Sequence, residues 1–338
     1  MRCRPESVRG SEPGEGYLQA GHQQGHISSL LPVDDSEYVH SHCPLTMASR
    51  RVALVTGSQQ GIGLAIVRAL CRQLGESGTV YLTALDSGLR DEAVASLKAE
   101  GLNPVSRMLD VTDQNSIDAI RDDIAKQYGG LDILVNNAAI AYLDNSIPMS
   151  VQAENTMKVN FYGIVNMTKT LMPLIRDRGR IVNVCSRGGV QAFNKLTPEL
   201  QKRFKDVTTE QGVIDLMEEF LQATKRGDHM ERGWPDWAYG TSKLGSITLT
   251  RVQGQAMAES QAQRGILINC CHPGYVDTPM TAHHSAERAK NRITVEEGAD
   301  TPVYLSLLPP GTTGIQGCFL SRRTIYDFFN NPVDHSKL

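Results

Sequence analysis

The sequence lacks the long apolar run, the excess of one charge and the cysteine pairs that mark several large classes of protein. None of its hydrophobic stretches approaches the roughly 20 residues that a membrane helix needs, so no membrane partner is expected. Lys and Arg number 34 against 37 Asp and Glu, and they form no basic run that would indicate a nucleic-acid surface. The 7 cysteines include no Cys-x-x-Cys pair, which argues against a disulfide framework and a zinc site. The simplest expectation is a reducing, cytoplasmic compartment.

Residues 1–46 lack sustained periodicity, and their composition differs from that of the rest of the chain. They include Gly-Ser-Glu-Pro-Gly-Glu-Gly at 10–16 and scattered histidines, and we predict that they form a disordered extension. They also lack the charged start and apolar core of a signal peptide. Arg2 and Arg4 are compatible with a transit peptide, but the acidic residues and the missing amphipathic pattern argue against one. Scattered histidines in such a tail are usually solvated, so we expect no metal.

From Met47 onward, short apolar runs alternate with helical patterns, and we expect one domain over 47–338. Strand–helix alternation predicts right-handed crossovers and a parallel sheet covered on both faces. The expected fold is therefore α/β, a doubly wound, Rossmann-type parallel sheet of about seven strands with helices on both faces. Predicted strands lie at 52–55, 79–82, 104–109, 131–135, 180–184 and 266–270, and predicted helices include 62–74, 114–128 and 150–176.

The first predicted strand runs into a glycine-rich turn that opens the first helix. Glycines let the backbone turn tightly and approach a pyrophosphate, whose charge is favoured by the helix N-terminus. The spacing Gly-x-x-x-Gly-x-Gly differs from the common Rossmann spacing, and a glycine-rich turn alone is often only a tight turn. Its position between strand and helix indicates a dinucleotide site. The residues of this turn that we expect to contact the cofactor are Gly57, Gln59, Gln60, Gly61, Ile62 and Gly63.

Polar side chains follow several predicted strands at the carboxyl edge, where ligands bind in open α/β sheets. Asp110 and Val111 follow the third strand, where a carboxylate can hydrogen-bond near an adenine, and Asn137 follows the fourth. Each alone is equally well explained as a strand-end turn. Ser186 follows the fifth strand without a surrounding Gly-x-Ser-x-Gly elbow, which argues against a hydrolase nucleophile. Asn160 lies inside a predicted helix, where it either faces water or has a specific role.

Tyr239 and Lys243 are four residues apart in a predicted helix, so their side chains lie on one face. A nearby ammonium group favours the phenolate form of a tyrosine and makes the phenol a proton donor near neutral pH. By itself the pair is weak evidence, because Tyr-x-x-x-Lys occurs by chance on many solvated helix faces. Its meaning depends on the nucleotide turn and the strand-end residues that precede it.

In this order and at these strand ends, the motifs resemble those of the short-chain dehydrogenase/reductase superfamily, and within it the monomeric carbonyl reductases. The resemblance covers about 51–325, ending past Pro273-Gly274. It implies that Tyr239 is the general acid and that Lys243 lowers its pKa and binds the nicotinamide ribose. It also implies that Ser186 polarises the substrate carbonyl and that Asn160 supports a proton-relay water at a helix distortion. The nicotinamide cofactor supplies the hydride.

The resemblance extends to further contacts with cofactor and substrate. Thr278 matches the position that contacts the nicotinamide amide, and Val276 lies in the same cofactor-binding segment. An apolar pocket for a small carbonyl compound is expected beside Ser186, although buried core aromatics explain some of its candidate residues equally well. The candidates are Trp234, Trp237, Tyr275 and Met280.

A long segment separates Ser186 from Tyr239, where a minimal member of the superfamily has a short loop. The extra residues, about 190–235, include a helical pattern at 210–225. In the carbonyl reductases such an insertion resembles an added helix pair that covers the usual oligomer surface. The resemblance therefore implies a helical insertion before the catalytic tyrosine and a monomer.

The choice of nicotinamide cofactor is not read directly from charge. The NADP-type positions in the glycine turn and after the second strand hold Gln60 and Leu85 instead of basic residues, and the NAD-type acid position holds Ala84. Arg90, or a group of amide donors in the turn, remains available for a 2′-phosphate. The family resemblance favours NADPH, with NADH as the alternative.

The leading hypothesis is an NADPH-dependent carbonyl reductase that acts on ketones, aldehydes or quinones. One alternative is a catalytically inactive dinucleotide sensor, although every catalytic position is filled. A second is a nucleotide-sugar epimerase, which shares Tyr-x-x-x-Lys but differs in glycine spacing and has a larger C-terminal substrate region.

Overall fold

The computed structural model describes residues 50–142, 144, 146–282 and 286–330. These belong to one compact unit of the chain, Leu45–Leu338. The predicted extension at 1–46 lies outside the described residues. Among the described residues, no helix is both long enough and apolar enough to span a membrane.

The described strands form one sheet in the order β3-β2-β1-β4-β5-β6-β7-β8. All pairings are parallel except the one between β7 and β8. The order reverses between β1 and β4, and such a reversal opens a crevice at the carboxyl ends of the strands. The strands are β1 (Arg51–Val55), β2 (Gly78–Ala84), β3 (Val105–Met108), β4 (Leu131–Asn136), β5 (Ile175–Val184), β6 (Leu267–His272), β7 (Phe319–Ser321) and β8 (Thr324–Ile325).

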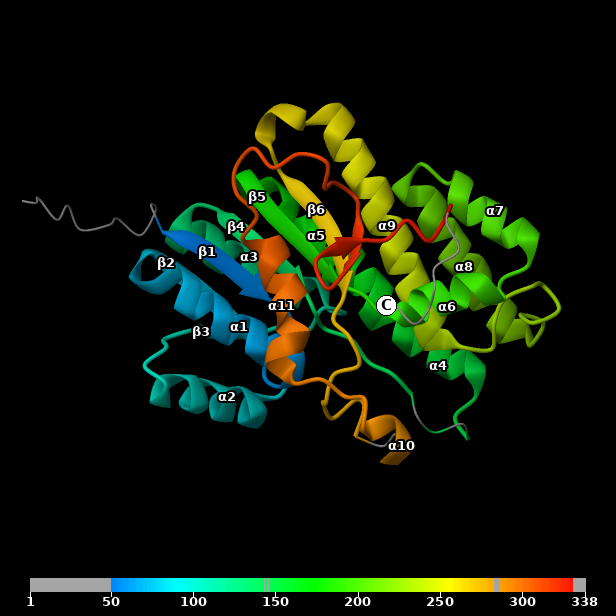
Figure 1. The fold of residues 1–338 in the computed structure, drawn as a ribbon, viewed down its shortest axis with the longest axis horizontal. Helices are drawn as coiled ribbons and strands as arrows, with labels where there is room; N and C mark the ends of the chain where they lie inside the picture. Colours follow the sequence, from blue (N-terminus) through cyan, green and yellow to red (C-terminus); the bar gives the residue numbers. More distant parts are fainter. Residues whose placement is uncertain (1–49, 143, 145, 283–285, 331–338) are drawn as a thin grey trace, which may run out of the picture. The chain divides into compact units, whose positions relative to one another are not determined.

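Helices cover both faces of this sheet (Figure 1). Ala53 and Val55 of β1 pack with α1, α2 and α11, whereas Val52 and Leu54 pack with α3, α5 and α9. This alternation is the period of two that a buried strand requires. The main helices are α1 (Gly61–Leu74), α2 (Ser87–Ala99), α3 (Gln114–Tyr128), α4 (Met149–Met157), α5 (Gly163–Leu171), α6 (Arg187–Lys195), α7 (Pro198–Asp206), α8 (Glu210–Arg226), α9 (Ala238–Ser260), α10 (Ala286–Ala289) and α11 (Val295–Ser306).

The doubly wound parallel sheet expected from the sequence is confirmed, with two differences. The sheet has eight strands, because β8 adds a short antiparallel edge after β7. The predicted helix over 150–176 is present as one helical run from Met149 to Leu174. It contains a π-helical turn, η3 (Lys158–Tyr162), and the chain enters β5 at Ile175.

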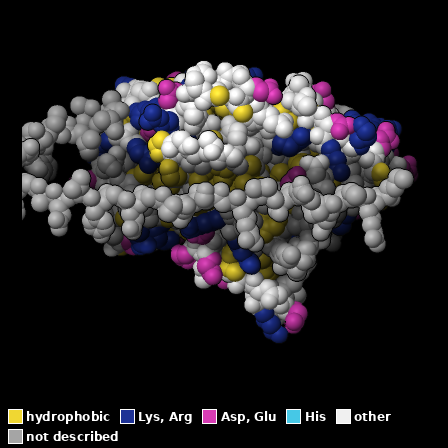
Figure 2. All heavy atoms as spheres, turned by 45° about the horizontal axis from the view of Figure 1, so that its top comes forward, with side chains coloured by type: hydrophobic (Ala, Val, Ile, Leu, Met, Phe, Trp, Pro, Cys, Tyr) yellow, Lys and Arg dark blue, Asp and Glu magenta, His cyan; other side chains and the backbone are white. Residues whose placement is uncertain are grey.

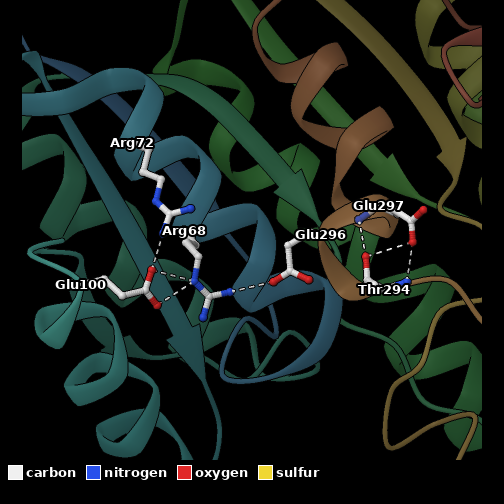
Figure 3. Close-up of polar contacts among 6 residues, drawn as sticks. All are labelled: Arg68, Arg72, Glu100, Thr294, Glu296 and Glu297. Atoms are coloured by element: carbon white, nitrogen blue, oxygen red, sulfur yellow. Dashed lines mark hydrogen bonds and ion pairs between the residues drawn. The ribbon is translucent and has the colours of Figure 1, made fainter.

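Ion pairs join the helices of one face (Figure 3). Arg68 and Arg72 of α1 bond to Glu100 at the end of α2, at 2.9 and 2.6 Å, and Arg68 lies 3.5 Å from Glu296 of α11. Thr294 caps α11 by a reciprocal pair of bonds with Glu297. Exposed pairs of this kind add little stability individually.

The insertion predicted before Tyr239 is present as α7 and α8, which lie beside α9 and α4 (Figure 1). Met217 of α8 packs so closely on α9 that a Cβ at Gly245 would lie 2.5 Å from its sulfur. On the face that Figure 2 presents, positive and negative side chains are interspersed, with no field of one sign.

Candidate functional site: a dinucleotide cleft with a Tyr–Lys pair

The glycine turn is shaped by positions where a side chain does not fit. Gly57 and Gly61 have φ of 58° and 56°, in the left-handed region that favours glycine. A Cβ at Gly57 would lie 2.8 Å from Ala138 Cα, and one at Gly63 would lie 2.5 Å from Asn137 Nδ2. The turn therefore needs glycine both for its backbone conformation and for its contact with the end of β4.

The end of β4 is hydrogen-bonded into the same turn. Asn137 donates its side-chain amide to the carbonyl oxygens of Thr56 and Gly57, at 3.0 and 2.8 Å. In return, Thr56 Oγ1 accepts the backbone N–H groups of Asn137 and Ala138, both at 3.0 Å. Asn137 thus holds the two sides of the crevice together, so that the turn is formed in advance of binding.

A cleft of about 330 Å³ opens beside this turn. No side chain caps the N-terminus of α1, so its backbone N–H groups are directed at the cleft. These features fit a dinucleotide, with its pyrophosphate at the helix N-terminus. Of the predicted cofactor residues, those that line the cleft are Gly57, Gln59, Gln60, Gly61, Ile62, Gly63, Asp110, Val111, Asn137, Tyr239, Lys243 and Thr278.

One corner of the cleft decides between the two nicotinamide cofactors. Gln60 and Leu85 line it, and the Leu85 side chain is 64% exposed. Asp86 caps α2 by accepting the Leu89 N–H at 2.8 Å, so its carboxylate is already bonded to the helix N-terminus. Arg90, in the first turn of α2, is the nearest arginine along the chain, and its Nε is buried without a partner. Neither Gln60 nor Leu85 supplies a cation for a 2′-phosphate at this corner.

Tyr239 and Lys243 project into this cleft from successive turns of α9. The Lys243 ammonium lies 5.9 Å from the centre of the Tyr239 ring and donates a hydrogen bond to the Val184 carbonyl at 2.8 Å. Lys243 is 2% exposed. The predicted pairing of a phenol with a buried positive charge is therefore present, and β5 holds the charge in place.

Ser186 lies directly after β5 and caps α6. Its Oγ accepts the Gly188 N–H at 3.0 Å, which leaves the hydroxyl hydrogen to donate elsewhere. Its neighbour Cys185 lines the cleft, and a Cβ at Gly189 would lie 2.9 Å from the backbone of both Lys243 and Leu244. The contact of α6 with α9 thus brings Ser186 next to the cleft that Tyr239 and Lys243 line, although Ser186 itself is not among the lining residues.

Asn160 sits in the π-helical turn η3, fully buried. Its amide bonds to both the N–H and the carbonyl of Ile140, at 2.8 and 2.9 Å, and to Ser242 Oγ at 3.1 Å. The helix distortion expected at Asn160 is present, and its side chain joins the segment after β4 to α9. π-Helical turns are frequent at functional sites.

Some predicted site residues are not among those that line the cleft. They are Asn160, Ser186, Trp234, Trp237, Tyr275 and Val276. Trp234 is 2% exposed and packs between Phe204 and Phe220, with ring centres 5.9 and 5.4 Å away, because α7 and α8 form an aromatic core around it. The Arg292 guanidinium lies over the Tyr275 ring, 5.9 Å from its centre. Val276 is buried and bridges to Ile293. Met280, by contrast, lines the cleft as predicted.

Several residues of the cleft were not predicted from the sequence. They are apolar and carry no motif, although each lies within three residues of a residue that does. They include Leu109, Ile140, Val159 and Pro279. Proximity to a motif is the signal that could have identified them.

Two thiols of β6, Cys270 and Cys271, are shielded from solvent. Burial raises the pKa of Cys271 well above its usual value, and the pKa of Cys270 likewise. Beside them, burial lowers the pKa of His272 to about 3, and the charges of Arg187 and Arg322 act in the same direction. His272 is therefore neutral at physiological pH, and the thiols are protonated.

Comparison with known proteins agrees with this geometry. The family model described as short chain dehydrogenase matches residues 51–198 and 229–289, leaving out most of α7 and α8. Carbonyl reductase (NADPH) 1 of Sus scrofa is 46% identical over 290 residues, 85% of this chain and 98% of that protein. Carbonyl reductase (NADPH) 3 of Rattus norvegicus is 47% identical over 269 residues, 79% of this chain and 94% of that protein.

Among solved structures, salutaridine reductase from Papaver somniferum aligns with a TM-score of 0.68 at 30% identity, over 80% of this chain and 99% of that one. Menthone neomenthol reductase from Mentha piperita aligns with a TM-score of 0.64 at 28% identity, over 80% and 98%. The glycine turn, the Tyr–Lys pair and these relatives lead to one conclusion: this chain is a member of the short-chain dehydrogenase family.

Proposed function

We propose that the protein reduces ketones, aldehydes or quinones to alcohols with NADPH. One observation carries the proposal: Tyr239 and Lys243 of one helix line the same cleft as the dinucleotide turn, with Ser186 at the neighbouring strand end. In this proposal Tyr239 is the proton donor and Ser186 a hydrogen-bond donor, and the nicotinamide would bind beside them. The relatives named for NADPH-dependent carbonyl reduction support the same activity.

Each residue has a separate part in this reaction. The glycine turn and Lys243 would hold the nicotinamide cofactor, which when bound would supply a hydride for the carbonyl carbon. The Ser186 hydroxyl donates a hydrogen bond to the carbonyl oxygen, and Tyr239 transfers its phenolic proton to that oxygen as negative charge develops there. The ammonium of Lys243 stabilises the phenolate that remains. Asn160 keeps Ile140 and α9 in position, and a relay water beside it returns a proton to the site.

The test is oxidation of NADPH on addition of a quinone such as menadione, followed by absorbance. We expect turnover by the wild-type protein and its loss in Tyr239→Phe, which keeps the ring and removes the proton. Tyr162→Phe serves as a matched control, since Tyr162 bonds to exposed Glu218 away from the cleft. Full activity in Tyr239→Phe would exclude the mechanism. The Tyr239→Phe variant should still bind NADPH. Retained binding would show that its activity is lost through the missing proton donor and not through a failure to fold.

The cofactor is tested in the same assay by running NADH alongside NADPH. NADPH is proposed because both named carbonyl reductases use it. The cleft corner at Gln60 and Leu85 has no cation in its lining. We therefore expect the dissociation constants for NADPH and NADH to differ by only a small factor. Equilibrium binding of 2′-phosphorylated and unphosphorylated adenosine fragments measures this ratio independently of turnover.

We further propose a monomeric, cytoplasmic enzyme. The support for a monomer is the packing of α8 over α9 and α4, where Met217 meets Gly245 and also contacts the buried core. Light scattering on the purified protein tests this proposal, and a stable dimer at micromolar concentration would contradict it. Fractionation of cells that express the full chain tests the compartment.

The inactive-sensor alternative is less well supported, because the proton donor, the cation and the strand-end hydroxyl are all in place. The epimerase alternative lacks support from the reductases to which the chain is similar.

A further inference from the structure

Helix α9 carries both Tyr239 and Lys243, and protein surrounds most of its length. None of its residues from Ala238 to Gly254 is exposed. A helix at the surface is oriented by its single apolar stripe, whereas a helix that is buried all round has no such stripe to fix its rotation. Apolar contacts are also non-directional. Directional hydrogen bonds must therefore specify the rotation and height of α9, and with them the place of Lys243.

Two hydrogen bonds join α9 to neighbouring residues of β5. The Lys243 ammonium donates to the Val184 carbonyl at 2.8 Å. Two turns further along the helix, Thr250 Oγ1 accepts the side-chain amide of Asn183 at 2.9 Å. Asn183 directly precedes Val184, and both Asn183 and Thr250 are fully buried. Bonds at two points on α9 limit its sliding and its rotation, which a single bond to a flexible lysine cannot do.

A seam of buried hydroxyl groups leads from Thr250 back to the tyrosine. The Thr250 hydroxyl donates to the Ser246 carbonyl at 2.7 Å. Ser246 Oγ lies 2.9 Å from the carbonyl oxygens of both Ser242 and Asn160, and Ser242 Oγ donates to the Tyr239 carbonyl at 2.8 Å. Such bonds along a helix's own backbone do little to stabilise it. The bond from β5 to Thr250 joins this seam to the sheet, and the bond to Asn160 joins it to η3.

We propose that the hydrogen bond between Asn183 and Thr250 positions Lys243 for the reaction, by setting the rotation and height of α9 on β5. Both are positioning residues, because they are fully buried and neither is among the residues that line the cleft. A misplacement of about 1 Å can cost a hundredfold in rate, even when its cause lies away from the chemistry. This inference rests on the proposed function and adds to it residues that act from behind the cleft.

The first test measures binding and needs no turnover. Thr250→Val keeps the shape of the side chain and removes its hydroxyl. We expect its dissociation constant for NADPH to rise about fivefold, the effect of one hydrogen bond, because Lys243 moves away from the nicotinamide ribose. The dissociation constant for adenosine 2′,5′-bisphosphate, which has no nicotinamide ribose, should stay constant. Equal weakening of both ligands, or of neither, would overturn the proposal.

Thr248→Val is the matched control. Thr248 is also fully buried in α9 and donates to the carbonyl four residues before it, that of Leu244, at 2.9 Å. Within the described part of the chain its hydroxyl bonds to no strand residue. Thr248→Val should therefore leave NADPH binding unchanged, and a loss equal to that in Thr250→Val would contradict the inference.

A double-mutant cycle distinguishes positioning of Lys243 from a general loosening of the core. Thr250→Val should weaken NADPH binding no further once Lys243→Ala is present, because the group through which it acts has been removed. Additive losses would show that Thr250 does not act through Lys243. Asn183→Ala breaks the same bond from its other partner and should give the same pattern, so the proposal is also tested if Thr250→Val fails to fold.

The kinetic test follows NADPH oxidation with menadione. We expect Thr250→Val to lower kcat by about tenfold and to leave KM for menadione unchanged, since the ammonium acts on a phenolate that forms only during the reaction. Thr250→Ser, which keeps the hydroxyl, should recover kcat. A change in KM alone, or no recovery in Thr250→Ser, would refute the proposal. If the wild-type protein bound NADPH but reduced no carbonyl compound, the proposed function would fail, whereas the binding cycle would still test the positioning of Lys243.

Discussion

The glycine turn and the helical insertion reach stability by opposite means. The turn at 56–63 is held by hydrogen bonds from the Asn137 side chain to its backbone carbonyls and by the absence of side chains at Gly57 and Gly63. The insertion of α7 and α8 is held by bulky rings, with Trp234 enclosed between Phe204 and Phe220. The turn therefore depends on the absence of Cβ atoms, whereas the insertion depends on the presence of large aromatic side chains.

This difference determines how each region responds to change. A side chain added in the turn has few ways to move aside, because backbone atoms surround the position that it would take. Loss of a ring in the insertion leaves a cavity whose cost depends on how far the neighbours collapse. We therefore expect changes in the turn to alter cofactor affinity and changes in the insertion to alter the free energy of unfolding. Each should have little effect on the other property.

Removal of the central ring of the insertion should have the largest effect. Trp234→Ala should lower the free energy of unfolding by about 3–5 kcal/mol, the usual cost of deleting a buried aromatic side chain. Urea denaturation measures this loss. The folded fraction of Trp234→Ala should bind NADPH with the same dissociation constant as wild type. A large change in that constant at low temperature would show that the two regions are coupled.

The converse change is a side chain in the turn. Gly63→Val would place a Cβ 2.5 Å from Asn137 Nδ2 and 2.6 Å from the Gly57 carbonyl, so the crevice must widen. We expect about a hundredfold weaker NADPH binding, roughly 2.7 kcal/mol, by fluorescence titration. Gly101→Val controls for strain alone, because Gly101 has a positive φ but no atom within 4 Å of the position that a Cβ would take. Equal losses in both variants would refute the steric explanation.

His272 lies at the end of β6, outside both the turn and the insertion, and should make the free energy of unfolding depend on pH. Its pKa is lowered from 6.5 to about 3 by burial, so the unfolded chain binds a proton that the folded chain does not, between these pH values. Stability should therefore be complete above about pH 6.5 and fall as the pH decreases, by about 1.4 kcal/mol per pH unit from this group.

His272→Gln should remove that part of the slope. Urea denaturation at pH 7.5 and 5.0 measures it, with the wild-type protein as the reference. The same slope in both proteins would show that His272 is not the responsible group.

The smallest expected effect concerns the cofactor corner. Leu85→Arg should favour NADPH over NADH by about fivefold, near 1 kcal/mol, because an exposed guanidinium gains a charge-assisted bond to the 2′-phosphate. Leu85→Gln is a control of similar size without charge. The gain should shrink as salt concentration rises. A gain for both cofactors alike would indicate an effect of size and not of charge.

The two regions also differ in how far the sequence predicts them. The turn, Asn137 and the Tyr239–Lys243 pair were predicted because each depends on residue type at fixed spacing, which local geometry enforces. The place of Trp234 was wrong, because an aromatic residue near a catalytic tyrosine carries no sign of which way its ring faces. That direction depends on Phe204 and Phe220, which are distant in sequence.

The π-helical turn η3 within the long helix was equally hidden in periodicity, since such a turn changes the phase by one residue and leaves the composition unaltered. Asn160 was the only local sign of it. The extra strand β8 is too short to show an alternating pattern, and its pairing depends on β7.

The contact between Gly189 and the backbone of α9 has a consequence for how the enzyme responds to heat. The spacing of α6 and α9 beside Lys243 depends largely on main chain, because a methyl group added at Gly189 would lie 2.9 Å from backbone atoms of Lys243 and Leu244, as well as 2.8 Å from Ile247 Cδ1. Side-chain rotamers exchange faster on warming, whereas the main-chain part of this contact has no rotamer to exchange. We expect an Arrhenius plot of turnover to stay linear up to the temperature at which the protein unfolds.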